Sequence, residues 1–359
     1  MKTNFFKKRN LVLIITTLAL VQLFLMFNPT YFTGESPNFK NGKFWNSFDD
    51  TGLVREKREK NLFFKWQKER WKNDVSWKKE DIEKFAIFKP YEKLEQVENL
   101  SIVFVGHATF LIQMHGVNIL TDPIWSERAS PVSFAGPKRH TKPGINFDEL
   151  PKVDYVLISH SHYDHLDIPT IKKLQKAFNP VFITGLGNCY FLNKRKKLNI
   201  QCEEKDWGEF LEVKPGFRIF FEKAKHWAKR TLFDSNETLW GSFVIKSEKY
   251  NIFFSGDTGL ANHFEMIRKT YGAFDVSLLG IGAYKPKYIM QYSHLSPEEA
   301  VKAHIDLHSK QSFGMHLKTF QLSDETFNEP VEDLETEKQK VKIPSESFVV
   351  LDFGERRNF

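Results

Sequence analysis

From Leu100 onward, short apolar runs broken by turn residues alternate with segments of helical spacing. Residues 101–122 read SIVFVGHATFLIQMHGVNILTD, which is typical of two or three short strands, and residues 153–160 read VDYVLISH, which is typical of a buried strand. Residues 168–178 have the spacing of an amphipathic helix. Further strands are predicted at 181–185, 218–227, 241–247, 251–257 and 276–282. This alternation over about 250 residues predicts layers of sheet and helix, with functional residues at strand ends and in the loops after them.

The first 28 residues are predicted to form a signal anchor, a transmembrane helix that precedes the rest of the chain. Residues 11–27 read LVLIITTLALVQLFLMF, carry no charge and follow Lys7, Lys8 and Arg9. A helix of this length spans about 25 Å, close to the thickness of a bilayer core. Basic residues before the run outweigh those after it, so a single-pass membrane protein is expected, with a cytoplasmic N-terminus and an extracytoplasmic body. A cleaved leader is the alternative, although no A-x-A-like cleavage site follows the run.

Residues 29–97 form a basic, aromatic-rich lead-in, and residues 98–359 are the expected catalytic domain. In the lead-in, aromatic and charged residues interleave, which is typical of an element on a membrane surface or of a helical segment that packs its aromatics on the main domain. Residues 1–95 hold 19 basic and 12 acidic residues and supply the whole net charge of +7, whereas residues 96–359 hold 33 of each. The body therefore lacks the charge bias of nucleic-acid-binding proteins, and no nucleic-acid partner is expected.

Cys189 and Cys202 are the only cysteines in the chain. Two are too few for a disulfide framework or for a cysteine-based zinc site. A single isolated disulfide stays open as an alternative. Nothing in the spacing of the two residues indicates pairing, so two unpaired, partly buried thiols are predicted.

A string of potential metal ligands ends the predicted strand at 153–160. His160, His162, Asp164 and His165 form an H-x-H-x-D-H pattern. Imidazole nitrogens and carboxylate oxygens are ligands that zinc prefers, and burying so many polar groups without a partner is costly. In an extended turn, His160 and His162 point to the same side, while Asp164 and His165 lie about one helical turn further on and can face a second metal. The string therefore predicts a pair of metal sites.

This string, together with FSGDTG at 254–259 and isolated downstream histidines, resembles the metallo-β-lactamase-fold hydrolases. The resemblance covers nearly all of residues 98–325. It implies an α/β fold of the αββα sandwich type that holds two zinc ions between its layers. The strings GHATFLIQ at 106–113, HWAKRTLFDSNETLWGSF at 226–243 and HLSPEEAVKAH at 294–304 are similar to one branch, the N-acylphosphatidylethanolamine-hydrolysing phospholipase D.

Carried onto this chain, the resemblance implies seven metal ligands. One zinc ion would be bound by His160, His162 and His226, the other by Asp164, His165 and His316, with Asp257 bridging both. Gly256 and Gly259 beside Asp257 allow the tight turn that this role needs, although an N-cap aspartate is the alternative. His294 would sit beside the scissile phosphate and orient the substrate or handle a proton. Lys318 stands where the family more often has a small residue, so the lip of the site is expected to differ.

Together these features predict a metal-dependent hydrolase, a zinc-dependent phosphodiesterase of the phospholipase D type. Its expected substrate is a membrane phospholipid, N-acylphosphatidylethanolamine, which a hydroxide bridging two zinc ions would convert to phosphatidic acid and N-acylethanolamine. Asp164 and His294 are predicted to take direct part in this reaction. The same site could instead act on a lactone, a β-lactam, a thioester or another phosphodiester. A non-catalytic binding protein would lack one or more ligands, and all seven are present.

Two further residues are candidates for orienting a metal ligand without binding the metal. His107 and Asp122 each follow a predicted strand, and a turn-stabilising role is an equal alternative for both. The other histidines are predicted to be surface or helix-face residues: His115, His140, His263, His304 and His308.

Overall fold

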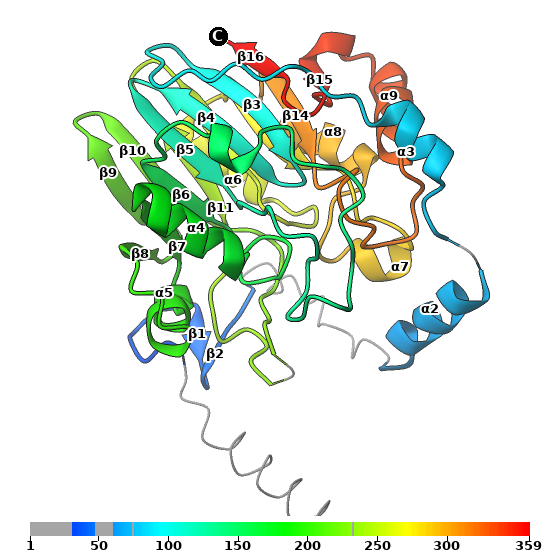
Figure 1. Cartoon of the computed structure of the whole chain (residues 1–359), viewed down its shortest axis with the longest axis horizontal. Helices are drawn as coiled ribbons and strands as arrows, with labels where there is room; N and C mark the ends of the chain where they lie inside the picture. The colour runs from blue at the N-terminus through cyan, green and yellow to red at the C-terminus, as the bar shows by residue number, and fades with distance from the viewer. Residues whose placement is uncertain (1–30, 47–59, 74, 232) are drawn as a thin grey trace, which may run out of the picture.

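Two β-sheets stacked face to face form the centre of the molecule. The computed structural model describes residues 31–46, 60–73, 75–231 and 233–359, and in this part of the chain each of the two sheets has seven strands. Helices cover the outer faces of both sheets, and Figure 1 shows how the chain passes from the first sheet to the second.

The first sheet has the strand order β16-β3-β4-β5-β6-β7-β8. Its strands are β3 (Ser101–Gly106), β4 (Thr109–Met114), β5 (Val117–Thr121), β6 (Tyr155–Ile158), β7 (Val181–Gly185), β8 (Cys202–Lys205) and β16 (Arg356–Asn358). β3, β4 and β5 pair antiparallel and are buried along their whole length, which explains their nearly continuous apolar sequence. From β5 to β8 the pairing is parallel, so the carboxyl ends of these strands meet at one edge of the sheet.

The second sheet has the strand order β15-β14-β13-β12-β11-β10-β9. Its strands are β9 (Phe210–Lys214), β10 (Phe217–Glu222), β11 (Ser242–Lys246), β12 (Asn251–Phe254), β13 (Val276–Gly280), β14 (Gln311–Met315) and β15 (Phe348–Val349). β9 to β12 pair antiparallel, and β12 to β15 pair parallel. The second sheet thus repeats the change of pairing seen in the first, and its parallel strands again end at one edge.

The helices lie outside the two sheets. They are α2 (Lys60–Lys72), α3 (Lys79–Phe85), α4 (Ile168–Phe178), α5 (Asn188–Tyr190), α6 (His263–Tyr271), α7 (Lys287–Met290), α8 (Pro297–Asp306) and α9 (Glu329–Val341), with short helical turns η2 (Phe147–Glu149), η3 (Phe191–Arg195) and η4 (Ser345–Ser347). α8 begins with a capping box, in which the Ser296 side chain accepts from the Glu299 backbone and the Glu299 carboxylate accepts from the Ser296 backbone. This cap fixes the chain just after His294.

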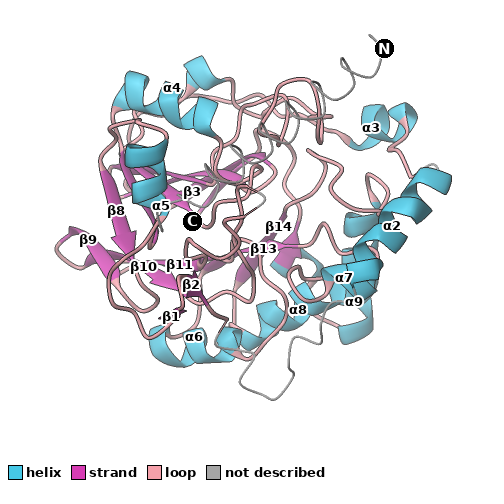
Figure 2. Cartoon of the chain, turned by 90° about the horizontal axis from the view of Figure 1, so that it is seen from below, coloured by secondary structure: helices cyan, strands magenta, loops and turns pink. Residues whose placement is uncertain are grey.

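Three apolar layers hold the sheets and helices together. Between the sheets, Phe104 and Phe110 of the first sheet belong to the same buried cluster as Phe221 and Phe254 of the second, and burying each ring contributes roughly 1.5–3 kcal/mol. A second cluster joins α4 to the outer face of the first sheet, and a third joins α6, α8 and α9 to the outer face of the second. Figure 2 shows strands between α4 on one side and α6 and α8 on the other. The predicted αββα sandwich is therefore confirmed.

The described part of the lead-in packs on the main body through aromatic side chains. β1 (Phe39–Lys40) and β2 (Lys43–Phe44) form a small hairpin whose Phe44 is fully buried in the core between the sheets. On α2, Trp66 donates to Asp324 at 2.6 Å. The indole of Trp77 donates to the carbonyl of Glu325 at 2.8 Å. These contacts agree with the alternative in which the lead-in packs its aromatics on the main domain.

The predicted single-pass membrane localisation, with the catalytic domain outside, is contradicted. No helix in the described ranges is both long and apolar enough to cross a bilayer. The longest of them, α2 and α9, have 13 residues each and are rich in charge, whereas a crossing needs about 20 apolar residues. The run proposed as the anchor, residues 11–27, lies outside the described residues.

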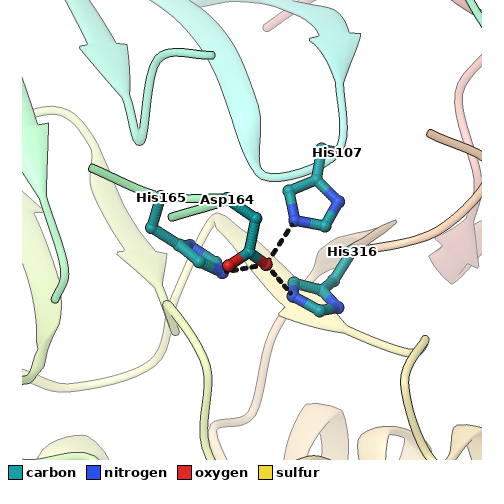
Figure 3. Close-up of side chains that lie close together, drawn as sticks. All are labelled: His107, Asp164, His165 and His316. Atoms are coloured by element: carbon teal, nitrogen blue, oxygen red, sulfur yellow. Dashed lines mark hydrogen bonds and ion pairs between the residues drawn. The ribbon is translucent and has the colours of Figure 1, made fainter. Parts of the chain in front are cut away.

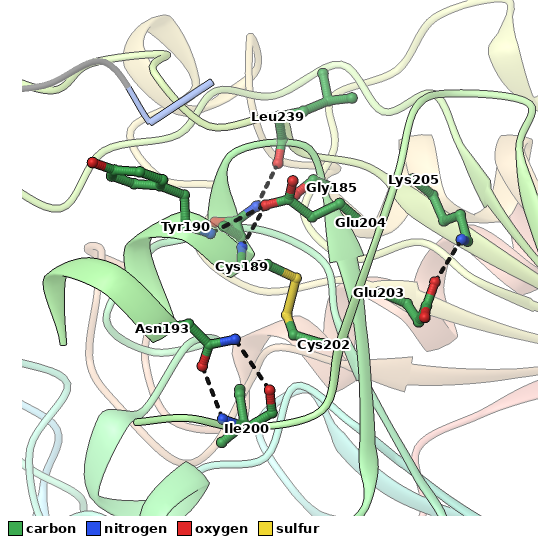
Figure 4. Close-up of a disulfide and its surroundings, with 11 residues drawn as sticks. Gly185, Cys189, Tyr190, Asn193, Ile200, Cys202, Glu203, Glu204, Lys205 and Leu239 are labelled. Carbon is green, nitrogen blue, oxygen red and sulfur yellow. Dashed lines mark hydrogen bonds and ion pairs between the residues drawn. A yellow bond between two sulfur atoms is a disulfide. The ribbon is translucent and has the colours of Figure 1, made fainter. Parts of the chain in front are cut away.

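The prediction of two unpaired thiols is wrong, because Cys189 and Cys202 form a disulfide (Figure 4). The chain leaves β7, passes through α5 and η3, and returns as β8, which pairs parallel to β7. This return brings the start of β8 next to α5, with 5.7 Å between the two Cα atoms. The sequence separation of 13 does not reveal such a return, which depends on the pairing of β7 with β8.

Candidate metal centre

The predicted metal ligands follow the carboxyl ends of strands from both sheets and gather at one edge of the sandwich. His160 comes two residues after β6, Asp257 three residues after β12, and His316 directly after β14. His226 lies in the loop between β10 and β11. The carboxyl ends of parallel strands are the usual place for a site in α/β sheets, so this edge collects residues that are far apart in the sequence.

One group of ligand atoms is made by His160, His162, His226 and Asp257. Each residue offers an atom within 4.8 Å of the others. His160 Nε2 lies 2.8 Å from His162 Nδ1, which in turn lies 3.2 Å from His226 Nε2. Three imidazole nitrogens that face one another at such distances, beside a carboxylate, form a set suited to a divalent cation.

A second group, shown in Figure 3, is made by Asp164, His165, His316 and His107. Asp164 Oδ2 lies 3.1 Å from His165 Nε2, 3.2 Å from His316 Nε2 and 2.9 Å from His107 Nε2. His107 is fully buried, and its contact with Asp164 is the shortest of the three. The structure thus places His107 where it orients the Asp164 carboxylate.

Asp257 lies between the two groups. Its Oδ2 is 3.1 Å from His165 Nε2 and 3.2 Å from His316 Nε2, both in the second group. The same oxygen is 3.8 Å from His160 Nε2 and 3.8 Å from His226 Nε2, both in the first. One carboxylate is therefore within reach of both sets of nitrogens.

Hydrogen bonds to the far side of the imidazoles set their orientation. His165 Nδ1 lies 2.7 Å from Asp122 Oδ2, and Asp122 also accepts from the backbone of Ser159 at 2.7 Å. His160 Nδ1 lies 2.9 Å from Ser159 Oγ. His226 Nδ1 donates to the carbonyl of Ser293 at 2.9 Å. With one ring nitrogen engaged in this way, the other nitrogen of each ring is turned toward the centre.

The protonation states of the first group suit cation binding. Burial lowers the pKa of His162 to about 4 and holds those of His160 and His226 well below the usual value, so these rings are neutral at pH 7. Burial alone would raise the pKa of Asp257, but the neighbouring His165 and His316 hold it well below its usual range, and the carboxylate stays charged. Neutral imidazoles and ionised carboxylates are the forms that bind metals.

In the second group the carboxylates of Asp257 and Asp164 outweigh burial and raise the pKa of His165, and that of His316 to about 9. A cation bound there therefore has to displace a proton from each ring.

The residues present pass a direct test of fit for a metal. His165 Nε2 is buried and has no hydrogen-bond partner, although Oδ2 of Asp164 and Oδ2 of Asp257 each lie 3.1 Å away. Unsatisfied buried nitrogens beside ionised carboxylates are expected where a cation completes the site, because each would otherwise cost about 1–3 kcal/mol.

His294 lies at the more open side of the centre. Its Nδ1 is 3.7 Å from Asp257 Oδ2, and its ring centroid is 5.2 Å from that of His226. The His294 side chain is 17% exposed, compared with 0–1% for His165 and His316. His294 and His162 are therefore the two histidines of this centre that are not fully buried, and His294 is one that a substrate can reach from solvent.

Comparisons with known proteins place the chain in a family. Residues 117–317 match the model of the beta-lactamase superfamily domain. The chain is 36% identical over 270 residues to N-acyl-phosphatidylethanolamine-hydrolyzing phospholipase D 1 of Caenorhabditis elegans, a match that covers 71% of this chain and 75% of that protein. The chain belongs to the metallo-β-lactamase-fold hydrolases.

Other matches agree with this family. An uncharacterized protein of Mycobacterium tuberculosis is 34% identical over 318 residues, covering 86% of this chain and 83% of that protein. The solved structure of a metallo hydrolase from Ignicoccus hospitalis superposes with a TM-score of 0.54 at 21% identity, covering 73% of this chain and 98% of that one. The second match shows the fold alone. As a member of this superfamily the protein is a hydrolase, and the fold implies that it binds a divalent metal.

All ten residues singled out from the sequence lie in or against this centre. Those in the two groups are His160, His162, Asp164, His165, His226, Asp257, His316 and His107, while Asp122 and His294 lie against them. Lys318 does not face the ligands with its charge, because its Nζ donates to the carbonyl of Phe85 at 3.2 Å. Lys318, which stands where the family more often has a small residue, therefore connects the rim of the site to the C-terminal end of α3.

Two of the histidines assigned to the surface or a helix face are in fact buried. His263 on α6 contacts Thr258 Oγ1 at 3.1 Å, and His304 on α8 contacts Ser312 Oγ at 2.8 Å. Both lie on the helix face that packs on the second sheet, so the helix-face assignment holds and the surface one does not. Sequence reasoning also missed Trp227, whose ring centroid lies 4.4 Å from that of His162. Its only signal is its position directly after His226.

Proposed function

We propose that this hydrolase is a zinc-dependent phosphodiesterase that converts N-acylphosphatidylethanolamine-type phospholipids to phosphatidic acid and N-acylethanolamine. The observation that carries the proposal is the pair of adjoining nitrogen and oxygen groups that meet at Asp257 Oδ2. Such a donor set suits zinc, and pairs of divalent ions about 3.5–4 Å apart serve in-line displacement at phosphorus.

Each group of residues would hold one ion. His160, His162 and His226 would bind the first, Asp164, His165 and His316 the second, and Asp257 would contact both. When bound, two zinc ions supply a Lewis acid for the phosphoryl oxygens and a lowered pKa for a coordinated water. The chain's own contribution is to orient these donors, and Asp122, Ser159 and Ser293 do so from behind the rings.

Asp164 and His294 are proposed to act directly in the reaction. Asp164 is held by His107 and remains ionised, because His165 and the hydrogen bond from His107 outweigh the effect of burial on its pKa. An ionised carboxylate at this place can accept a hydrogen bond from the attacking water and orient it. His294, at the open side, can donate to a phosphoryl oxygen or pass a proton to the departing headgroup oxygen.

The choice of substrate rests on likeness to the Caenorhabditis elegans protein, whose name states that it hydrolyses N-acylphosphatidylethanolamine. Water would add across the phosphorus–oxygen bond on the headgroup side, giving phosphatidic acid and N-acylethanolamine. Trp227, half-buried beside His162, gives the site an apolar wall next to the ligands. Such a wall is compatible with a lipid substrate.

The proposal is tested by offering the purified, zinc-loaded protein a panel of substrates. N-acylphosphatidylethanolamine in detergent micelles is compared with phosphatidylcholine, bis(p-nitrophenyl) phosphate, a lactone and a thioester. We expect release of N-acylethanolamine to be the fastest reaction and His294→Gln to slow it by about 10²–10⁴-fold with unchanged metal content. Faster turnover of the lactone or thioester would contradict the proposed substrate, and unchanged turnover in His294→Gln would contradict its role.

A further inference from the structure

Arg230 is a buried cation in the loop that also carries His226. The residue is 9% exposed, and among the described residues its guanidinium makes no ion pair with a carboxylate. Burial lowers its pKa to about 10, so it keeps its charge at pH 7. Removing a charge from water costs several kcal/mol unless hydrogen bonds compensate.

The compensation comes from the turn that carries the H-x-H-x-D-H string. Arg230 Nη1 lies 3.0 Å from the carbonyl of Ser161, 3.2 Å from that of His162 and 2.7 Å from that of Leu166. Its guanidinium carbon lies 3.7 Å from the centre of the Tyr163 ring. The Tyr163 hydroxyl donates back to the carbonyl of Arg230 at 2.5 Å. Side chain and backbone of Arg230 are thus both tied to residues 161–166.

The backbone of Arg230 is fixed from its other side as well. Asp234 Oδ1 accepts from the backbone nitrogens of Arg230 and Thr231 at 2.9 and 2.7 Å, and Asp234 Oδ2 accepts from the Tyr31 hydroxyl at 3.1 Å. These hydrogen bonds to Asp234 hold the backbone of the loop in place, and with it the Arg230 side chain. Since the same loop supplies His226, the contacts of Arg230 join two ligand-bearing segments that come from different sheets.

We propose that Arg230 is a positioning residue of the metal centre, which holds the 161–166 turn in the geometry that its ligands need. The inference rests on the proposed function only in taking His160, His162, Asp164 and His165 as metal ligands. The planar guanidinium can stack on Tyr163 while it donates to carbonyls, which an ammonium group cannot do. Loss of Arg230 leaves carbonyls of the turn unpaired and lets the ligands shift.

Arg139 provides a matched control. It is 7% exposed and donates to the carbonyls of Ser126, Ile124 and Thr141 at 3.1, 2.8 and 3.4 Å. Its guanidinium carbon lies 4.9 Å from the centre of the Phe320 ring. The two arginines therefore share burial, carbonyl partners and ring contact, but Arg139 binds carbonyls of the loop that follows Asp122, and that loop holds none of the seven predicted ligands.

The test compares Arg230→Met, Arg230→Lys and Arg139→Met in the full chain. The dissociation constant of zinc is measured by competition with a chelator, the visible absorption of the cobalt-substituted protein is recorded, and thermal unfolding is followed without metal. We expect Arg230→Met to weaken zinc binding by about 10–100-fold and to change the cobalt spectrum, as removal of groups that orient ligands does. Arg230→Lys should weaken binding about tenfold. Arg139→Met should lower the unfolding temperature and leave zinc affinity and spectrum unchanged.

The outcomes separate a positioning role from general destabilisation. Wild-type zinc affinity and cobalt spectrum in Arg230→Met would overturn the proposal, as would an equal loss of affinity in Arg139→Met. If Arg230→Met does not fold, Arg230→Lys decides, and an unchanged dissociation constant in that variant overturns the proposal. If the wild-type protein binds neither zinc nor cobalt, the metal centre is refuted, and the role of Arg230 is refuted with it.

Discussion

The two sheets contribute to the metal centre in different ways. In the first sheet, one strand end after β6 provides His160, His162, Asp164 and His165 in a single turn. The second sheet contributes its candidate ligands one at a time, from the loop after β10, from the turn after β12 and from the end of β14. A compact cluster is visible in the sequence, whereas scattered ligands become neighbours only when the parallel strands end at a common edge.

This comparison predicts that a scattered ligand matters as much as a clustered one. Asp257→Asn removes the carboxylate that lies within reach of both groups, and His162→Ala removes a ligand of the clustered turn. We expect each to lower turnover on the order of 10³-fold, corresponding to several kcal/mol of lost transition-state stabilisation. Bound metal is measured alongside activity.

The exposed His308→Ala serves as the control for these two variants and should keep full activity and metal content. Circular dichroism should show a native fold in all three proteins. Near-normal turnover in either Asp257→Asn or His162→Ala would break the account of a shared centre.

The next largest effect concerns the disulfide beside the first sheet. Replacing Cys189 and Cys202 by serine removes a link across a sequence separation of 13 in the unfolded chain and should lower the free energy of unfolding by about 3 kcal/mol. The cysteines are not among the residues of the metal centre, so zinc affinity should change little. Chemical denaturation of oxidised wild type and the double variant measures the difference. Equal midpoints would show that the disulfide does not stabilise the fold.

Removing a hydrogen bond that orients a candidate ligand, without removing the ligand, should have a smaller effect on zinc affinity. Asp122→Asn weakens the hydrogen bond to His165 Nδ1 and should reduce zinc affinity by about 10–100-fold. Asp154→Asn is the matched control, because Asp154 accepts from the Asn118 backbone just before β6, at the end of the strand opposite to the ligands. Chelator competition measures both. A larger loss in Asp154→Asn than in Asp122→Asn would contradict the assigned orienting role.

The smallest effect is a pH dependence of the free energy of unfolding, which comes from His304 on α8, a helix that packs on the second sheet. Burial lowers the pKa of His304 to about 4, so the folded form of this residue is neutral where the unfolded form, with a pKa of about 6.5, takes up a proton. The unfolded state then binds more protons, and stability falls as pH drops from about 6.5 toward 4. His304→Asn should reduce that slope by about 1.4 kcal/mol per pH unit in the metal-free protein. Denaturation at two pH values tests this, and an unchanged slope would contradict it.

Much of the fold could be predicted from the sequence, because several of its strands are buried on both faces and carry nearly continuous apolar sequences, as β3 to β5 do. The clustered candidate ligands could be predicted from the sequence, because four imidazole and carboxylate groups within six residues are costly to bury unless they bind a cation. Asp257 and His316 could be assigned only through the resemblance, since a single aspartate or histidine after a strand has many ordinary roles.

Other features have no sequence signal of their own. Arg230 binds backbone carbonyls, which every residue carries, so nothing in the sequence marks its partners. The pairing of Cys189 with Cys202 depends on the return of the chain from β7 to β8. The burial of His304 follows from the packing of α8 on the second sheet, and spacing along the helix alone did not distinguish that face from the surface.

The central claim is a pair of zinc ions held jointly by ligands from both sheets. The most direct measurement is a titration of the chelated protein with zinc, in which metal bound per chain and release of N-acylethanolamine are followed together. We expect activity to be absent without metal and to reach its maximum at about two zinc ions per chain. Full activity in the metal-free protein, or maximal activity at about one metal per chain or less, would contradict this claim.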